Sequence, residues 1–282
     1  MNGHFPRVLV VGAGIMGGGI AQVVAASGRT VFLHDADPQA GARALTAIRS
    51  SLEKLAEKGG GDPDEILTRI EIVDGFREAD LMIEAVSEDA RLKEAVFAAA
   101  DEALPESAVL ASNTSSIPIA TLAAATRRPD RVVGLHFFNP VSLLRLVEVI
   151  RTPDTSDDTV RMILELAREL GKEPIETRDV PGFAANRILM PFLNEAVAAL
   201  ADGVADAEGI DTAARLGFGH PIGPLELADL IGLDTCVAIM EVLERGLGEP
   251  RFAPHPLLRE HVAAGRLGRK SGEGFHRYDA KP

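Results

Sequence analysis

The sequence predicts an α/β fold in which a doubly wound, mostly parallel sheet is followed by a smaller all-α domain. Short apolar runs typical of buried strands alternate with helical patterns until about residue 180. The first of these runs leads directly into a Gly-x-Gly-x-x-Gly turn. Beyond the segment Asp179–Phe183, the apolar spacing is helical only. We therefore expect one domain over residues 1–181 and a second over residues 182–282.

The predicted elements of the first domain follow one another in regular order. Strands are expected at residues 8–11, 30–35, 69–73, 81–86, 108–112, 132–136 and 144–150, and helices at 15–26, 38–58, 89–104 and 155–170. The glycines and proline of 59–63 should end the second helix. In the second domain, helices are expected at 186–200, 206–216 and 224–242. Strands that alternate with helices predict a sheet with ligands at the carboxyl ends of its strands.

The glycine turn has the composition of a pyrophosphate-binding loop. Gly12 permits the tight turn out of the strand, and Gly14 lets the backbone approach a phosphate without an intervening Cβ. Gly17 allows the next helix to pack closely, so that its N-terminal N–H groups face the anion. An ordinary strand–turn–helix is the alternative interpretation, because glycine-rich turns are common.

Asp35 favours the dinucleotide interpretation. It ends the second predicted strand, close to the ~20-residue spacing expected for the carboxylate that binds an adenosine ribose diol. A carboxylate there would repel a 2′-phosphate, and no arginine follows close by in the sequence. We therefore expect NAD rather than NADP.

Composition excludes several classes of function. The chain is 46% hydrophobic and 25% charged, and its net charge of −13 argues against binding nucleic acid or an anionic membrane. No apolar run approaches the ~20 residues that span a bilayer. The single cysteine, Cys236, excludes an intrachain disulfide and a thiolate metal cluster. We expect a cytoplasmic protein that binds a small molecule and no metal.

His136 is the histidine best placed to act as a general base. It ends a predicted strand, and twelve positions later Glu148 interrupts an apolar strand, where an unpaired carboxylate is costly. A short two-strand excursion would bring the two side chains together, so that Glu148 could orient and stabilise the imidazole. A core histidine with a structural ion pair remains the alternative at this point. The other histidines lie near ends, turns or glycines with no evident carboxylate partner: His4, His34, His220, His255, His261 and His276.

Two polar segments could supply further contacts. The hydroxyls and amide of Ser112–Ser116 follow a buried strand and are expected to point toward the cleft at its end. Asn186 begins the first helix of the second domain, where substrate commonly binds. Taken alone, the first segment fits a helix cap and the second an ordinary surface residue.

Ordered motifs over nearly the whole chain resemble the L-3-hydroxyacyl-CoA dehydrogenases, and most of all their stand-alone bacterial members. The matching segments are 11–17 with 19–22, 112–116, 134–140, 146–149, 179–183 with 186–187, 223–224, 232–234 and 270–275. The resemblance implies a Rossmann-like NAD-binding domain, a helical domain through which the enzyme dimerises, and a short-chain acyl-CoA substrate.

The resemblance also implies roles for particular residues. His136 would be the catalytic base and Glu148 its partner, while Ser115 and Asn186 would hydrogen-bond the oxygen at C3. The implied cofactor contacts are Gly12, Ala13, Gly14, Ile15, Met16, Gly17, Asp35, Glu88, Lys93, Ser115, Asn139 and Lys270. The implied coenzyme A contacts are Ser51, Lys58 and Ser115.

A cationic patch on the long second helix is consistent with coenzyme A. Ser51, Lys54 and Lys58 are spaced i, i+3, i+7 and so share one face, which could capture an anion despite the acidic net charge. A solvated helix face is the alternative. Two rival functions remain to be compared, namely a dehydrogenase of a free hydroxy or sugar acid and a non-catalytic dinucleotide sensor.

Overall fold

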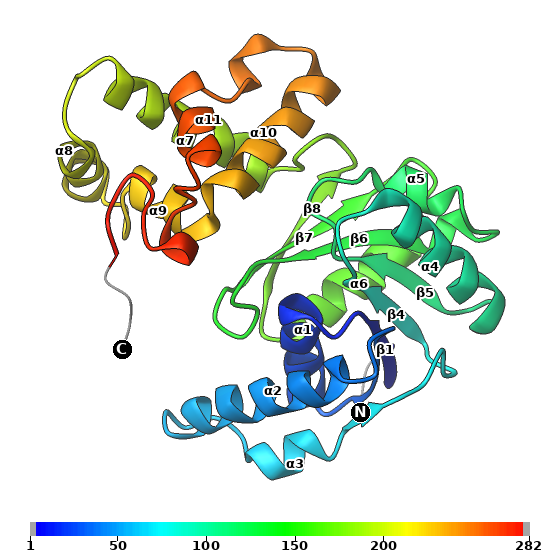
Figure 1. Cartoon of the computed structure of the whole chain (residues 1–282). Coiled ribbons are helices and arrows are strands. Elements are labelled where there is room, and N and C mark those ends of the chain that lie inside the picture. Colours follow the sequence, from blue (N-terminus) through cyan, green and yellow to red (C-terminus); the bar gives the residue numbers. More distant parts are fainter. Residues whose placement is uncertain (1–3, 279–282) are drawn as a thin grey trace. The chain divides into compact units, whose positions relative to one another are not determined.

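The computed structural model describes residues 4–278 and divides into two units, one ending at Val180 and the other beginning at Pro181. The first unit is built on a sheet, whereas the second is helical (Figure 1). Within the described residues, no helix combines the length and the apolar character needed to cross a bilayer.

The first unit contains an eight-stranded sheet in the order β3-β2-β1-β4-β5-β6-β7-β8. The strands are β1 (Arg7–Val11), β2 (Thr30–His34), β3 (Ile70–Ile72), β4 (Leu81–Glu84), β5 (Val109–Ser112), β6 (Val132–Phe137), β7 (Leu146–Arg151) and β8 (Glu173–Arg178). Neighbouring strands are parallel except β6 and β7, which are antiparallel. Because the order reverses beside β1, ligand groups are expected at the carboxyl ends of β1 and β4. The predicted fold class is confirmed.

Helices connect these strands and bury both faces of the sheet. They are α1 (Ile15–Ala26), α2 (Ala40–Ala56), α3 (Pro63–Leu67), α4 (Ala90–Ala103), α5 (Ile119–Ala123) and α6 (Asp157–Glu169). Asp89 caps α4 by accepting the Leu92 N–H, and Ser156 caps α6 by accepting the Thr159 N–H. Crossovers between neighbouring parallel strands are right-handed, and because β7 runs antiparallel to β6, α6 lies on the same face of the sheet as α1.

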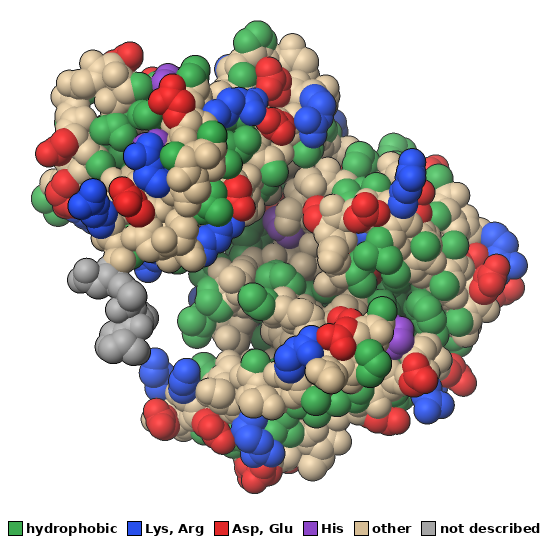
Figure 2. Space-filling model, viewed as in Figure 1, with side chains coloured by type: hydrophobic (Ala, Val, Ile, Leu, Met, Phe, Trp, Pro, Cys, Tyr) green, Lys and Arg blue, Asp and Glu red, His purple; other side chains and the backbone are tan. Residues whose placement is uncertain are grey.

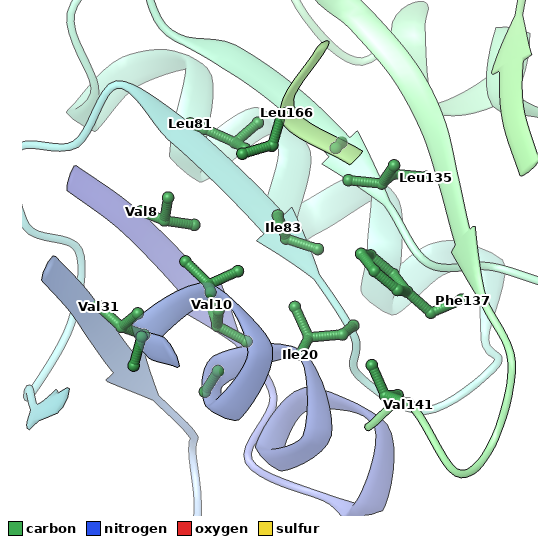
Figure 3. Close-up of a cluster of buried hydrophobic side chains, with 14 of the residues drawn as sticks. Val8, Val10, Ile20, Val31, Leu81, Ile83, Leu135, Phe137, Val141 and Leu166 are labelled. Carbon is green, nitrogen blue, oxygen red and sulfur yellow. The ribbon is translucent and has the colours of Figure 1, made fainter. Parts of the chain in front are cut away.

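One face of the sheet packs against α1 and α6. Val8, Val10 and Ile83 lie on the strands beneath Ile20 of α1, and Leu166 of α6 joins the same cluster (Figure 3). All five side chains are almost fully removed from water. The alternate side chain of the central strand, Leu9, is also fully buried but lies outside this cluster. Burial on both faces explains why the central strands are continuously apolar.

Some elements of the first unit differ from those predicted. The edge strand β8 was not expected, because its sequence is polar and contains Pro174, and its side chains are mostly exposed. The five-residue helices α3 and α5 were also missed, since such lengths show no periodicity. The helix predicted over residues 38–58 ends two residues earlier, at Ala56.

The second unit packs its helices around a separate core. They are α7 (Ala185–Ala201), α8 (Ala207–Thr212), α9 (Pro224–Ile231), α10 (Leu233–Leu247) and α11 (Pro256–Ala263). Leu193, Met240 and Leu258 are among the buried side chains of this core. The single helix predicted over 224–242 is wrong, because Gly232 has φ of +104° and separates α9 from α10. Only glycine adopts such a backbone without strain, so the chain turns there.

Candidate active site

The glycine turn between β1 and α1 is tightly packed at Gly12 and Gly17 and open at Gly14. Gly12 has φ of +101°, and a Cβ at this position would lie 2.5 Å from the Ala85 carbonyl oxygen. A Cβ on Gly17 would lie 1.7 Å from the Gly12 carbonyl oxygen, so the helix contacts the turn directly. By contrast, a Cβ on Gly14 would meet nothing within 4 Å. These residues therefore fit a pyrophosphate at the start of α1, where Ile15 and Met16 follow.

Asp35 lies directly after β2 and is joined to the glycine turn. Its Oδ2 accepts the Ala13 N–H at 2.7 Å, and its Oδ1 accepts the Asp37 N–H at 2.8 Å. Asp35 and Gly14 line the same cavity of about 530 Å³. Arg43 also lines this cavity, which corrects the expectation that no arginine is near, but its guanidinium pairs with Asp37.

His136 and Glu148 are directly opposite one another on the antiparallel strands β6 and β7. His136 Nδ1 lies 2.8 Å from Glu148 Oε2, and both side chains are buried. Because a carboxylate only accepts, Nδ1 carries the proton and Nε2 is left as the basic nitrogen. Ser115 Oγ lies 3.1 Å from Nε2. This Ser–His–Glu arrangement can take a proton from a hydroxyl and stabilise the resulting imidazolium.

The polar segment after β5 does not point as a whole toward the reacting centre, which corrects the expectation for Ser112–Ser116. Ser112 is fully buried and donates to Glu84 at 2.6 Å. Asn113 Oδ1 accepts the Phe137 N–H at 2.8 Å. Thr114 is buried too, whereas the Ser115 hydroxyl lies against His136. The hydrogen bond between Asn113 and Phe137 therefore joins the segment after β5 to β6.

Glu88 and Lys93, two of the implied cofactor contacts, lie beneath this segment. Lys93 is 1% exposed, with its Nζ 2.6 Å from Glu84 and 3.3 Å from Glu88. Glu88 accepts the Ser115 N–H at 2.9 Å. Sequence reasoning missed Glu84, although a charged residue ending the apolar strand Leu81–Glu84 is the same signal that identified Glu148.

Two of the three implied coenzyme A contacts, Ser51 and Lys58, line a second cavity of the first unit, whereas Ser115 lies against His136 and is not among the residues that line it. Ser51, Lys54 and Lys58 border about 450 Å³ of space together with Ser142 and Leu143. Lys58 follows the end of α2 rather than lying within it, yet it reaches the same cavity.

Acidic and basic side chains interleave on the visible face of the molecule (Figure 2), so the net charge of −13 is not gathered there into one acidic patch. The two lysines provide a local cationic site.

The remaining predicted site residues are distributed over both units. Asn139 is exposed and lines the larger cavity together with Ser51. Asn186 is the second residue of α7 in the second unit and is 7% exposed. Lys270, also in the second unit, has its Nζ 2.5 Å from Asp234 Oδ1.

Two histidines that the sequence left without partners do have carboxylate neighbours. His4 lies 3.0 Å from Glu165 at the surface, and His276 Nε2 lies 2.7 Å from the buried Asp211. Both pairs join segments far apart in the chain, which sequence spacing does not reveal. Across residues 4–278, no three histidine, cysteine, aspartate or glutamate side chains form a group suited to a metal ion.

Comparisons with known proteins agree with this geometry. Residues 7–180 match the family model of the 3-hydroxyacyl-CoA dehydrogenase NAD binding domain, and residues 182–278 match that of the C-terminal domain. A probable 3-hydroxybutyryl-CoA dehydrogenase of Deinococcus radiodurans is 52% identical over 95% of this chain and 99% of that protein. The human mitochondrial hydroxyacyl-coenzyme A dehydrogenase is 42% identical over 96% of this chain and 91% of that protein.

Solved structures give the same result. The (S)-3-hydroxybutyryl-CoA dehydrogenase of Ralstonia eutropha has a TM-score of 0.95 and 44% identity, covering 98% of this chain and all of that one.

Proposed function

The chain belongs to the 3-hydroxyacyl-CoA dehydrogenase family, and on that premise we propose that it reversibly oxidises a short-chain (S)-3-hydroxyacyl-CoA to the 3-oxoacyl-CoA. 3-Hydroxybutanoyl-CoA is the best candidate substrate, because relatives named for that activity are 43–52% identical over nearly the full length. The single observation that carries the proposal is His136, held between Glu148 and Ser115 at the end of a sheet strand.

NAD, when bound, supplies the acceptor for the hydride that leaves C3. His136 Nε2 removes the proton of the C3 hydroxyl, so that the carbon–oxygen double bond forms as the C–H bond breaks. Glu148, 2.8 Å from Nδ1, stabilises the positive charge that the imidazole acquires. The Ser115 hydroxyl, 3.1 Å from Nε2, holds the reacting oxygen beside the base. In reduction, His136 returns the proton.

The binding roles of the other residues are part of the same proposal. Asp35 would bind the adenosine ribose diol, and the glycine turn would hold the pyrophosphate. Glu88, Lys93, Asn139 and Lys270 would complete the cofactor site. Asn186 would hydrogen-bond the C3 oxygen from the second unit.

A His136→Gln variant tests the proposed base. We expect it to fold and to bind NADH like the parent, while kcat for acetoacetyl-CoA reduction falls about 10³-fold or more. His4→Gln is the matched control, because it removes a surface histidine that also faces a glutamate, at 3.0 Å. Near-normal reduction by a folded His136→Gln variant that binds NADH would overturn the assignment.

Coenzyme A recognition is tested at the cationic cavity. Replacing Lys54 and Lys58 together by glutamine removes both positive charges that border it. The KM for acetoacetyl-CoA should rise about 10-fold, because each lysine contributes a charge-assisted contact to an anionic substrate. Free acetoacetate serves as the comparison substrate. Efficient turnover of the free acid by the parent enzyme would instead favour a dehydrogenase of free hydroxy acids.

We also propose a homodimer in the cytoplasm. Large apolar side chains of the second unit are highly exposed, including Ile188 at 73%, Leu216 at 82% and Phe218 at 69%. A second copy of the chain would cover such side chains. The chain has one cysteine, Cys236, and so cannot form an intrachain disulfide, as suits a reducing compartment. Light scattering on the purified protein measures its oligomeric state, and a monomer would refute the proposed homodimer.

A further inference from the structure

Three charged side chains, two of them buried and the third partly exposed, form a cluster at the carboxyl ends of β4 and β5. Lys93, from α4, places its Nζ 2.6 Å from Glu84 Oε1 and 3.3 Å from Glu88 Oε2. Lys93 and Glu84 are almost fully removed from water. One ammonium faces two carboxylates, so the cluster holds one negative charge in excess.

Hydrogen bonds fix the carboxylate of Glu84 on both of its oxygens. Oε1 accepts the Val86 N–H at 2.7 Å as well as the Lys93 ammonium, and Oε2 accepts the Ser112 hydroxyl at 2.6 Å. All of these partners are donors, which is the environment that a carboxylate requires when it is removed from water. Ser112 faces Glu84 in the register of the two strands, so the pair is set by the sheet itself.

Glu88 is held as a carboxylate in the same way. Its Oε1 accepts the N–H groups of Ser115 and Ser116 at 2.9 and 3.0 Å and the Thr114 hydroxyl at 2.7 Å. Burial would raise the pKa of Glu88, but the charge of Lys93 and these hydrogen bonds bring the pKa below its ordinary value. Glu88 is therefore ionised at neutral pH.

The cluster is close to the reacting atoms. Ser115 donates its N–H to Glu88, and its hydroxyl lies 3.1 Å from His136 Nε2. The base takes a proton from the same substrate carbinol group that gives up the hydride, so the nicotinamide must approach these two residues. This placement rests on the function proposed above. It is consistent with the sheet, because β4 adjoins β1 where a dinucleotide crosses the strand ends.

Oxidised and reduced nicotinamide differ by one positive charge on the ring. A fixed negative charge nearby, shielded from water, attracts the oxidised ring and leaves the neutral reduced ring nearly unaffected. We propose that the Glu84–Lys93–Glu88 cluster sets the ratio of NAD⁺ to NADH affinity, and that Glu84 supplies the excess charge without contacting the cofactor. Glu84 is thus a positioning and electrostatic residue for the cofactor site.

A charge series tests this proposal by equilibrium binding. Glu84→Gln keeps the shape and makes the cluster neutral, and adding Lys93→Met restores one negative charge. At a separation on the order of 10 Å and an effective dielectric constant of about 20, one unit charge changes a binding constant about 10-fold. The Kd ratio of NAD⁺ to NADH should therefore rise about 10-fold in Glu84→Gln. It should return to within about threefold of the parent in the double variant.

The ratio cancels contacts that both cofactor forms lose equally, so a merely structural effect would not move it. Glu94→Gln, a neighbouring acid on α4 outside the cluster, is the control and should leave the ratio unchanged. If Glu84→Gln does not fold, Glu88→Gln removes the same amount of charge from a side chain that is 40% exposed.

Two results would overturn the proposal. One is a ratio within threefold of the parent when either glutamate is neutralised. The other is a Kd ratio in the double variant that differs from that of the parent as much as the ratio of Glu84→Gln does. Both measurements are made without acyl-CoA and with NADH fluorescence as the signal. A parent enzyme that fails to reduce acetoacetyl-CoA while the ratio still shifts would refute the proposed reaction and not the charge effect.

Discussion

Replacing Glu148 by glutamine separates the charge of this side chain from its shape. The carboxylate is fully buried and lies 2.8 Å from His136 Nδ1, on the strand that pairs with that of the histidine. Glutamine fills the same volume. It cannot, however, balance the imidazolium that forms when His136 takes the substrate proton. Its amide N–H₂ can also face Nδ1, which would move the ring proton to Nε2 and block the base.

The size of the effect follows from the separation of the two groups. Two unit charges 2.8 Å apart interact by about 6 kcal/mol at an effective dielectric constant of about 20. The glutamine dipole and local relaxation recover part of this energy, so we expect a loss of about 2–4 kcal/mol in the transition state. That loss corresponds to a fall in kcat of about 30- to 1,000-fold, since each ~1.4 kcal/mol is tenfold.

The assay is acetoacetyl-CoA reduction followed by NADH absorbance, with NADH affinity measured separately. We expect kcat to fall while the KM values and the NADH Kd stay within about threefold, because the Glu148 carboxylate contacts His136 and acts on proton transfer instead of on binding. Glu176→Gln is the matched control, since Glu176 lies on the adjacent strand β8 but pairs at the surface with Arg151 at 3.2 Å. A folded Glu148→Gln enzyme with kcat within threefold of the parent would refute the reasoning.

Four further variants test the cofactor site and stability. Gly17→Ala should lose about 2–4 kcal/mol of unfolding free energy, because its Cβ would lie 1.7 Å from the Gly12 oxygen. Gly14→Ala should keep its stability but bind NADH about 10-fold more weakly, as thermal unfolding and fluorescence titration would show; equal effects at both positions would contradict this. Asp35→Ser should lower the preference for NAD over NADP about 10-fold in kcat/KM, and an unchanged ratio would exclude its role. Burial would raise the pKa of Asp101, but hydrogen bonds from two neighbouring arginines hold the pKa below its ordinary value. Asp101→Asn should therefore cost about 2–4 kcal/mol at neutral pH, and this deficit should shrink as the pH falls from about 4 through the lower folded-state pKa. Urea unfolding of parent and variant at neutral pH and below about pH 4 measures the deficit. A deficit that is the same at both pH values would show that the charge of Asp101 does not cause it.

Patterns that extend over a few neighbouring residues made most of the fold predictable. The helix expected at residues 15–26 is α1, and the strands flanking it lie within a residue of their expected bounds. The one helix predicted for 224–242 failed at Gly232, whose positive φ the apolar spacing did not reveal. The edge strand β8 was missed because an exposed strand needs no apolar pattern.

In the candidate site too, features set by neighbouring residues were predictable from the sequence. A costly carboxylate in the apolar strand containing Glu148 pointed to a partner, and the hairpin-like register places that partner at His136. The glycine turn and Asp35 were visible because their spacing is set by one strand–helix–strand unit.

The sequence alone determined the alternation of strands and helices, and it predicted a pyrophosphate turn and the pair of His136 and Glu148 for proton transfer, because these patterns depend on short-range chemistry. Only the tertiary structure decided that Lys93 is buried between Glu84 and Glu88, and that Ser112 supports this cluster instead of facing the substrate. By residue pattern Lys93 is one more polar residue on an amphipathic helix, and only the family resemblance singled it out as a cofactor contact. Its ammonium lies beside Glu84 because α4 begins shortly after the carboxyl end of β4, and a charge removed from water must find its counter-charge within the protein.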